Sequence, residues 1–459
     1  MVNSSLLSDA QAIIKKADYE SDYTHFFDVE NILIRALEEE KKPETIAQLA
    51  HYYSRLDRVD EAISLLLAAL QIFKKSDLLY ANLGVAYTRT GDKQKAKQAF
   101  INAIHCKALD TQSIYNYCVL DKGRENKLES FIYEILKRYS LTNKDKANLY
   151  YSLGEIFHNK GDYKQAYEYF SKGAQEKETL CNYSNTVIEL KYLVYKLISS
   201  TIDGFKKKFH LKRDELEPEL IFIVGVPRSG STLLEQILSV KENVLGLGET
   251  TYFPASLNKK FTNFDSTDNF IKAFTELTLD EIHEMKIAYL SKITQHLNQN
   301  LSGKIIIDKL LGNFENIGFI KLLFPEAKII FTQREPKASA WSSFRINFKN
   351  TNVPYSYSFE NMNSYYDAYN NFKVLWEKNF EDIITFNYDK LISNPELEIN
   401  KLLKELGIDW DSKYLNFHNS KKSVQSASAM QVRRALYKDS SSSWKYYHDY
   451  LPEDFISIF

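Results

Sequence analysis

The sequence is poor in cysteine and has no long apolar run. Its 459 residues include only Cys106, Cys118 and Cys181, which are too few and too scattered for a disulfide framework or a zinc site. We therefore expect a reduced, cytoplasmic compartment. The first residues lack the apolar core and cleavage site of a signal peptide. No stretch approaches the roughly 20 apolar residues that cross a bilayer, so we expect no integral membrane segment.

An excess of charge of either sign is also absent. The 59 basic and 60 acidic side chains nearly cancel, which gives no basis for nucleic-acid binding through net charge. Apolar residues make up 44% of the chain, and this fraction argues against global disorder. The length predicts two or three domains, each able to bury its own core.

The first half contains an internal repeat. Residues 82–104 and 151–174 share glycine, alanine and phenylalanine at matched positions, each 70 residues apart: Gly84 and Gly154, Gly91 and Gly161, Ala96 and Ala166, Phe100 and Phe170. A weaker copy lies at 49–70, and the copy at about 110–140 is degenerate. The pattern resembles the tetratricopeptide repeat, in which paired helices stack into a solenoid. A generic helical bundle is the alternative.

The second half of the chain has a different pattern of apolar residues. Short apolar runs at 220–226, 304–309, 327–335 and 382–388 alternate with helical patterns such as 232–240 and 314–324. This alternation predicts a parallel sheet covered by helices on both faces. Residues 178–212 predict one long helix before Pro218. We therefore predict a helical domain at 1–177, a helical linker at 178–217 and an α/β domain at 218–459.

The loop after the first predicted strand reads GVPRSGST at 225–232. It fits the phosphate-loop pattern except that Ser231 replaces lysine. Backbone N–H groups of Ser229, Gly230, Ser231 and Thr232 would face an anion at the start of the next helix. Arg228 can donate forked hydrogen bonds to a phosphate, and Thr232 keeps its hydroxyl. The sequence therefore predicts an anion site here.

The loop and its surroundings, VGVPRSGSTLLEQIL, resemble the PRSGTT-type loop of sulfotransferases. The nearest resemblance is to the bacterial branch that joins tetratricopeptide repeats to a domain similar to tyrosylprotein sulfotransferases. It implies a P-loop-type, three-layer α/β fold after an all-helical solenoid. It also implies 3′-phosphoadenosine 5′-phosphosulfate as the sulfuryl donor, with no metal required. Ser231 replaces the first threonine of the family's loop and keeps the hydroxyl.

Further candidate residues follow the other strands, and the resemblance gives their roles. Arg334 ends a strand and Ser342 lies on the next helix; together they would bind the donor's 3′-phosphate. Glu249, in the stretch VLGLGETTYF, would be the general base. Lys309 would neutralise charge that develops on the transferred group. Asp308 is expected to orient Lys309 or to cap the next segment.

The C-terminal third adds weaker candidates. Tyr388 is either a contact near the adenosine or a core tyrosine. Ser428, Arg433 and Arg434 lie in a stretch, 426–444, that resembles the family's lid over the nucleotide. The tyrosylprotein enzymes carry a lysine in this lid where Ser443 stands here.

Two other functional classes stay open at this stage. One is a P-loop kinase of small molecules, disfavoured by the missing loop lysine. The other is a repeat-based protein-binding adaptor with an inactive nucleotide domain, disfavoured by the joint presence of Arg228, Glu249, Lys309, Arg334 and Ser342. The resemblance implies an acceptor hydroxyl, with protein tyrosine as one candidate. The repeats suggest a protein or peptide partner, and homodimerisation is also open.

Overall fold

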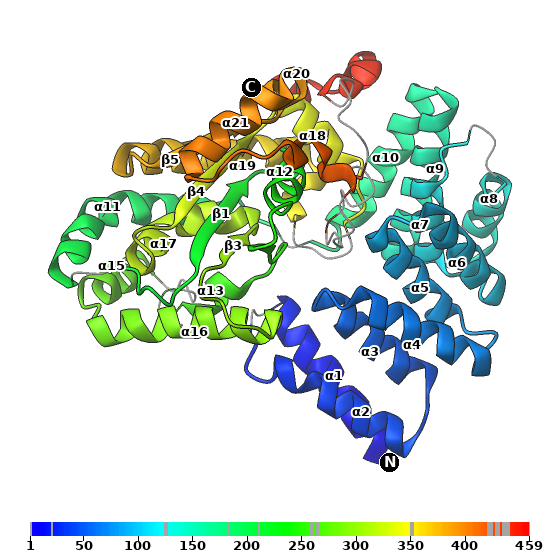
Figure 1. The fold of residues 1–459 in the computed structure, drawn as a ribbon. Coiled ribbons are helices and arrows are strands. Elements are labelled where there is room, and N and C mark those ends of the chain that lie inside the picture. The colour runs from blue at the N-terminus through cyan, green and yellow to red at the C-terminus, as the bar shows by residue number, and fades with distance from the viewer. Residues whose placement is uncertain are drawn as a thin grey trace.

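The computed structural model describes residues 2–19, 22–123, 127–181, 183–209, 212–257, 261, 266–348, 353–419, 426, 432–433 and 441–458. Figure 1 shows an array of helices from the N-terminal part of the chain beside a domain built on a central sheet. No helix in these ranges is both long and apolar enough to cross a membrane.

The N-terminal array consists of antiparallel helix pairs. Its helices are α1 (Val2–Tyr19), α2 (Val29–Glu39), α3 (Pro43–Arg55), α4 (Val59–Ile72), α5 (Asp77–Thr90), α6 (Lys93–Cys106), α7 (Thr111–Leu120), α8 (Glu129–Arg138), α9 (Asn143–Lys160) and α10 (Tyr163–Glu178), with a short 3₁₀ turn η1 (Phe26–Asp28) before α2. The predicted helical repeats are confirmed, and the degenerate copy is also helical: α7 packs against α6 and α9, and α8 packs against α9.

Small residues let the two helices of a repeat approach closely. A Cβ atom added at Gly84 would lie 2.5 Å from the ring of Phe100, and one at Gly154 would lie 2.5 Å from the ring of Phe170. Gly91 and Gly161 end the first helix of each pair in the left-handed conformation, both with φ of 85°, which glycine adopts without steric cost. The four matched glycines therefore have two separate roles, close packing and helix termination.

The predicted long helix over 178–212 is present as α11 (Thr186–Phe209), but it begins eight residues later than predicted. Helix α10 ends at Glu178, and α11 follows a turn. In this turn the Ser184 hydroxyl accepts a hydrogen bond from the Thr186 N–H group, and such local side-chain bonds compete with helix continuation. Helix α11 packs against the sheet domain, where Tyr195 contacts the rings of Phe319 and Trp376.

A five-stranded parallel sheet forms the centre of the second half. Its strands are β1 (Glu219–Gly225), β2 (Val244–Gly246), β3 (Ile305–Asp308), β4 (Lys328–Gln333) and β5 (Ile383–Asn387), in the order β2-β3-β1-β4-β5. All neighbours run parallel. The four predicted strands are present, whereas β2 was not predicted because three residues are too short for a recognisable apolar run.

Helices cover both faces of this sheet. The helical elements are α12 (Ser231–Leu238), α13 (Tyr252–Ser256), α15 (Thr267–Thr275), α16 (Leu279–Leu297), η2 (Leu311–Asn316), α17 (Ile317–Leu323), α18 (Pro336–Phe344), η3 (Pro354–Tyr357), α19 (Phe359–Asn379), α20 (Tyr388–Ser393), α21 (Pro395–Leu406), η4 (Ser412–Asn419), η6 (Ser443–Tyr450) and α22 (Glu453–Ile456). Ile221 and Ile223 of β1 pack in one core with α12, α20 and α21. Phe222 and Val224 point to the other face and pack in a core with α16, α17 and α19. The predicted three-layer α/β fold is confirmed.

The strand order reverses between β1 and β4. From β1 the chain passes through α12 to β2, at one end of the strand order. From β4 it passes through α18 and α19 to β5, at the other end. Ligands of open parallel sheets bind at the carboxyl ends of the strands, at this switch point. The loop at 226–230 and Arg334 follow the two strands that flank it.

We predict that Gly154→Val destabilises the chain, because its branched side chain would overlap the buried ring of Phe170. Overpacking of this kind costs about 1–3 kcal/mol. The matched control is Gly312→Val, since nothing lies within 4 Å of a Cβ at Gly312. Urea unfolding should give a lower midpoint for Gly154→Val than for the control, and equal midpoints would contradict the packing role of Gly154.

Candidate functional site

The loop between β1 and α12 is held in shape by the neighbouring strand β4. The Ser229 hydroxyl donates to the Val226 carbonyl at 2.7 Å and shares a hydrogen bond of 2.6 Å with the Thr332 hydroxyl. Gly230 has a φ of 96° and caps α12, and Arg228 also has a positive φ, 68°. A non-glycine residue in this region is uncommon and is characteristic of functional loops.

The hydroxyls predicted to bind an anion have different surroundings. The Ser229 side chain is fully buried and bonded within the protein, so only its backbone N–H stays a candidate ligand. Ser231 and Thr232 form the first turn of α12, and the Thr232 hydroxyl donates to the Ser426 hydroxyl at 3.1 Å. The start of α12 therefore presents N–H groups and hydroxyls together, the combination that favours anions.

One cluster of polar residues gathers Arg228, Arg334, Ser342 and Tyr388. Arg228 Nε donates to Ser342 Oγ at 2.9 Å, and Arg334 Nη1 donates to the Arg228 carbonyl at 2.9 Å. The Arg334 guanidinium lies over the Tyr388 ring, 4.9 Å from its centroid. A Cβ at Gly230 would lie 2.5 Å from the same ring. Four candidates from three separate stretches of the sequence thus meet near the carboxyl ends of β1, β4 and β5.

Two residues of this cluster were missed by the sequence analysis. Arg334 Nε donates to Ser441 Oγ at 3.1 Å, and Ser441 in turn donates to a carboxylate oxygen of Asp389. The other Asp389 oxygen accepts the Glu335 N–H at 2.8 Å. Asp389 directly follows Tyr388, so its position after a strand was a usable signal. Ser441 lies in a run of serines, and this run gave no signal that singled it out.

A second cluster lies at the ends of β2 and β3 and contains the predicted base. Lys309 Nζ donates to Glu249 Oε1 at 2.8 Å and lies 3.8 Å from Glu235 Oε2. The Lys309 side chain is fully buried, whereas 47% of the Glu249 side chain is exposed. Glu249 is therefore held by a buried cation and still faces solvent, as a base that meets an acceptor must.

The protonation of this cluster follows from burial and pairing. Burial alone would lower the pKa of Lys309, but Glu249 and Glu235 outweigh it and raise that pKa above its ordinary value. Burial raises the pKa of Glu235, with Lys309 acting against it. Lys309 therefore stays cationic at neutral pH. Glu235, a charged residue inside the apolar run of α12, is a member of the site that its sequence context could have revealed.

Asp308, next to Lys309 in the sequence, has a structural role. Its carboxylate accepts hydrogen bonds from the Leu310 N–H, the Asn313 side chain and the Tyr289 hydroxyl. Burial raises the pKa of Asp308 to about 7. These contacts agree with the expectation that Asp308 caps the segment after β3.

The candidates in the C-terminal stretch are only partly visible. Ser428 and Arg434 lie outside the described residues. Arg433 Nη2 donates to the Arg89 carbonyl at 2.8 Å, and its side chain lies against Gly91. The structure thus places Arg433 on the second repeat pair, α5 and α6, rather than in the Arg334 cluster.

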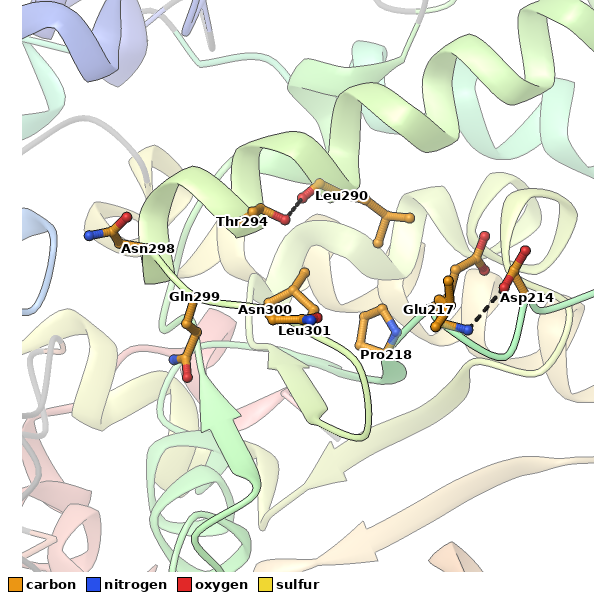
Figure 2. Close-up of a pocket in the computed structure, with 10 residues that line it drawn as sticks. Asp214, Glu217, Pro218, Leu290, Thr294, Asn298, Gln299, Asn300 and Leu301 are labelled. Carbon is orange, nitrogen blue, oxygen red and sulfur yellow. Dashed lines mark hydrogen bonds between the residues drawn. The ribbon is translucent and has the colours of Figure 1, made fainter.

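Two cavities lie at the opposite edge of the sheet. The first, about 670 Å³, is lined by Asp214, Glu217, Pro218 and the end of α16, as Figure 2 shows. The second, about 490 Å³, is lined by residues at the starts of β1, β3 and β4. None of the predicted site residues lines either cavity. Because parallel sheets bind ligands at the carboxyl ends of their strands, we assign the site to the two clusters instead.

Comparison with known proteins gives the class of this domain. Residues 218–412 match the sulfotransferase family model, and residues 79–104 and 147–179 match the tetratricopeptide repeat. Residues 218–412 are therefore similar to sulfotransferase domains, and the two segments that match tetratricopeptide repeats precede them.

Individual relatives resemble different parts of the chain. An uncharacterised protein of Aquifex aeolicus is 26% identical over 85% of this chain and 51% of its own length. Protein-tyrosine sulfotransferase 1 of Danio rerio is 26% identical over 43% of this chain and 55% of its own. A putative protein-tyrosine sulfotransferase of Caenorhabditis briggsae is 26% identical over 49% of this chain and 80% of its own. The chain thus spans about half the length of the first two of these relatives.

Solved structures with some likeness are also sulfotransferase domains. The domain of the Synechococcus olefin synthase is 21% identical, with a TM-score of 0.38, over 54% of this chain and 96% of that one. The domain from the curacin biosynthetic pathway is 17% identical, with a TM-score of 0.36, over 52% and 96%.

We predict that Lys309→Met destabilises the chain because Glu235 loses its buried cation. Breaking such a pair costs about 3–5 kcal/mol. A buried carboxyl with a raised pKa favours the fold at low pH and disfavours it as the pH rises, so the loss should be larger at pH 8 than at pH 5. Adding Glu235→Gln should restore most of the stability in thermal melts. A double variant as unstable as Lys309→Met would contradict the pairing.

Proposed function

We propose that this chain transfers a sulfuryl group from 3′-phosphoadenosine 5′-phosphosulfate to an acceptor hydroxyl. The observation that carries the proposal is the pair of clusters on either side of α12. One holds Glu249 on a buried lysine, and the other joins two arginines to Ser342 and Tyr388. The sulfotransferase family match of this segment supports it.

The hydrogen-bond donors of the two clusters and the loop fit a nucleotide with two anionic ends. Forked guanidinium donors and hydroxyls suit phosphate and sulfonate oxygens. In the proposal, Arg334 and Ser342 bind the 3′-phosphate. Arg228, the N–H groups at 229–232 and the hydroxyls of Ser231 and Thr232 bind the 5′-phosphosulfate. Tyr388 lies beside the adenosine, and Ser428 and Arg434 belong to the covering segment, whereas Arg433 is bonded to the Arg89 carbonyl of the repeats.

The bound donor would supply a sulfonate whose bond to phosphate oxygen breaks as the acceptor oxygen bonds to sulfur, leaving adenosine 3′,5′-bisphosphate. Glu249 takes the acceptor proton on a carboxylate oxygen. Lys309 keeps that carboxylate in place and stays charged, because its pKa is raised by its two carboxylate neighbours. In this proposal protein cations rather than a metal ion neutralise the developing negative charge.

Protein tyrosine is the acceptor that we propose, and the repeats are the surface that we propose for binding the acceptor protein. The support is the similarity to relatives named protein-tyrosine sulfotransferases and the tetratricopeptide match. A peptide acceptor would reach Glu249 from its exposed side.

We predict that adenosine 3′,5′-bisphosphate raises the melting temperature by a few degrees, because a ligand at about 100 times its Kd stabilises the folded state by about 2.7 kcal/mol. ADP with Mg²⁺ should stabilise much less. Arg334→Ala should remove most of the bisphosphate effect, whereas Arg213→Ala, at the opposite edge of the sheet, should keep it. Equal stabilisation by the two nucleotides would favour a kinase and contradict the proposal.

We predict that Glu249→Gln binds the bisphosphate normally but transfers sulfate about 10²–10⁴-fold more slowly, because the amide cannot accept the proton. Transfer of radiolabelled sulfate to a panel of tyrosine peptides, sugars and lipids measures this and also identifies the acceptor. Glu242→Gln, an exposed residue just before β2, is the matched control. Undiminished turnover in Glu249→Gln would exclude Glu249 as the base.

A further inference from the structure

Several hydrogen bonds connect the end of helix α18 to the repeats. Residues 344–348 bond to side chains of α7, α9 and α10. The contacts are Tyr151 Oη to the Phe344 carbonyl (3.1 Å), the Asn347 N–H to Tyr115 Oη (3.0 Å), Asn347 Nδ2 to Asn148 Oδ1 (2.6 Å) and Lys177 Nζ to the Phe348 carbonyl (2.7 Å). The repeat groups bond mainly to backbone, so they fix the path of the chain as it leaves α18.

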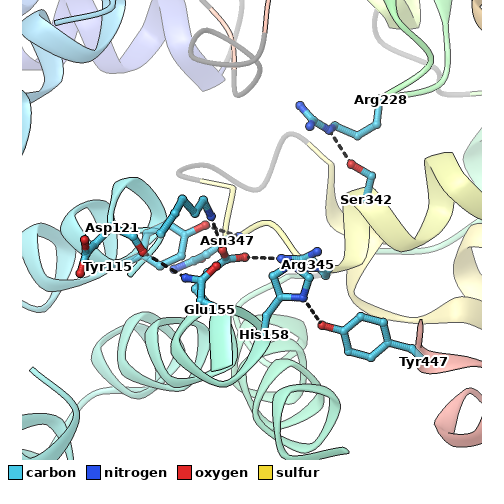
Figure 3. Close-up of polar contacts among 11 residues, drawn as sticks. Tyr115, Asp121, Glu155, His158, Arg228, Ser342, Arg345, Asn347 and Tyr447 are labelled. Carbon is cyan, nitrogen blue, oxygen red and sulfur yellow. Dashed lines mark hydrogen bonds and ion pairs between the residues drawn. The ribbon is translucent and has the colours of Figure 1, made fainter. Parts of the chain in front are cut away.

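A buried ion pair strengthens the same junction. Arg345, the C-cap of α18, donates to Glu155 Oε1 of α9 at 2.8 Å, and Lys122 donates to the other Glu155 oxygen at 2.9 Å. Burial would raise the pKa of Glu155, but Lys122 and Arg345 outweigh it and hold that pKa well below its usual range. Figure 3 shows Glu155 beside Arg345, and it shows Arg228 bonded to Ser342 of α18.

The C-terminal segment meets the repeats at the same place. His158, one turn after Glu155, shares a hydrogen bond of 2.7 Å with Tyr447 Oη of η6. The Tyr447 ring packs against Trp341 of α18 at 4.2 Å between centroids. This segment starts just after Ser441, which bonds to Arg334. One face of α9 therefore holds both α18 and the segment that leads to the Arg334 cluster.

Ser342 stands one helical turn before Arg345 and accepts the hydrogen bond of Arg228. A shift of the last turn of α18 would therefore move Ser342. We propose that the last repeat pair, α9 and α10, sets the selectivity of the site at Arg334 and Ser342 for a 3′-phosphate. In this arrangement Glu155 is a positioning residue, which acts through Arg345 on the helix turn that carries Ser342. This inference rests on the proposed function, which assigns Ser342 to the 3′-phosphate.

The test compares adenosine 3′,5′-bisphosphate with 5′-AMP, which lacks only the 3′-phosphate, by calorimetry on the full chain. Glu155→Gln should weaken bisphosphate binding about tenfold and leave 5′-AMP binding unchanged. Arg345→Gln should do the same, and the double variant should be no worse than either, because the two act as one unit. Glu129→Gln, whose carboxylate pairs with Lys160 within the repeats, is the matched control and should keep the wild-type ratio.

Tyr447→Phe is a milder second variant, because it removes one hydroxyl and keeps the ring packing. It should lower the ratio of the two affinities in the same direction. If the wild type prefers the bisphosphate but both Glu155→Gln and Tyr447→Phe keep its ratio, the positioning role is overturned and the proposed function stands. If the wild type itself does not distinguish the two nucleotides, the 3′-phosphate assignment and this inference both fail.

Discussion

The candidate site depends on one buried ammonium group. Lys309 is removed from water at the end of β3, and a buried charge is tolerated only when it is paired and hydrogen-bonded. The pairing comes from two different elements, Glu249 after β2 and Glu235 in α12. Backbone bonds close the arrangement, since the Lys309 N–H donates to the Gly248 carbonyl and the Gly248 N–H donates to Glu235. The position of Glu249 is therefore set by the ends of β2 and β3 together with α12.

The repeats contact both halves of the site. Near their start, Tyr23 shares a hydrogen bond of 2.8 Å with the Thr251 hydroxyl, two residues after Glu249, and its ring packs on Tyr252. Near their end, Glu155 pairs with Arg345 beside Ser342. A flexibly tethered docking module would not need buried ionic and hydrogen-bonded contacts at both places. The contacts indicate that the repeats and the sheet domain form one structural unit.

The sequence predicted features that depend on local patterns. Apolar runs located β1, β3, β4 and β5, and matched glycines located the repeats, because these signals lie within a few residues. The strand-end rule then brought Arg228, Arg334 and Tyr388 to one edge of the sheet. Long-range partners were not predictable: Glu155 and Arg345 are 190 residues apart, and nothing in either local sequence marks the pair. The start of α11 was predicted too early, because the polar turn between Glu178 and Thr186 does not interrupt the helical pattern of the sequence clearly.

The absence of a lysine in the loop now has a more specific interpretation. Lys309 is the nearest candidate to replace it, but its charge is already shared between two carboxylates. Lys309 is therefore better placed to hold Glu249 than to bind a phosphate. In the proposed function, Arg228 and Arg334 therefore carry most of the charge that meets the anion, and they are linked because Arg334 donates to the Arg228 carbonyl. Ser229 is used to lock the loop onto Thr332, so the loop has its shape before any ligand arrives. A preformed site with its two arginines after different strands suits a ligand with two separated anionic groups better than the single triphosphate chain of a kinase substrate.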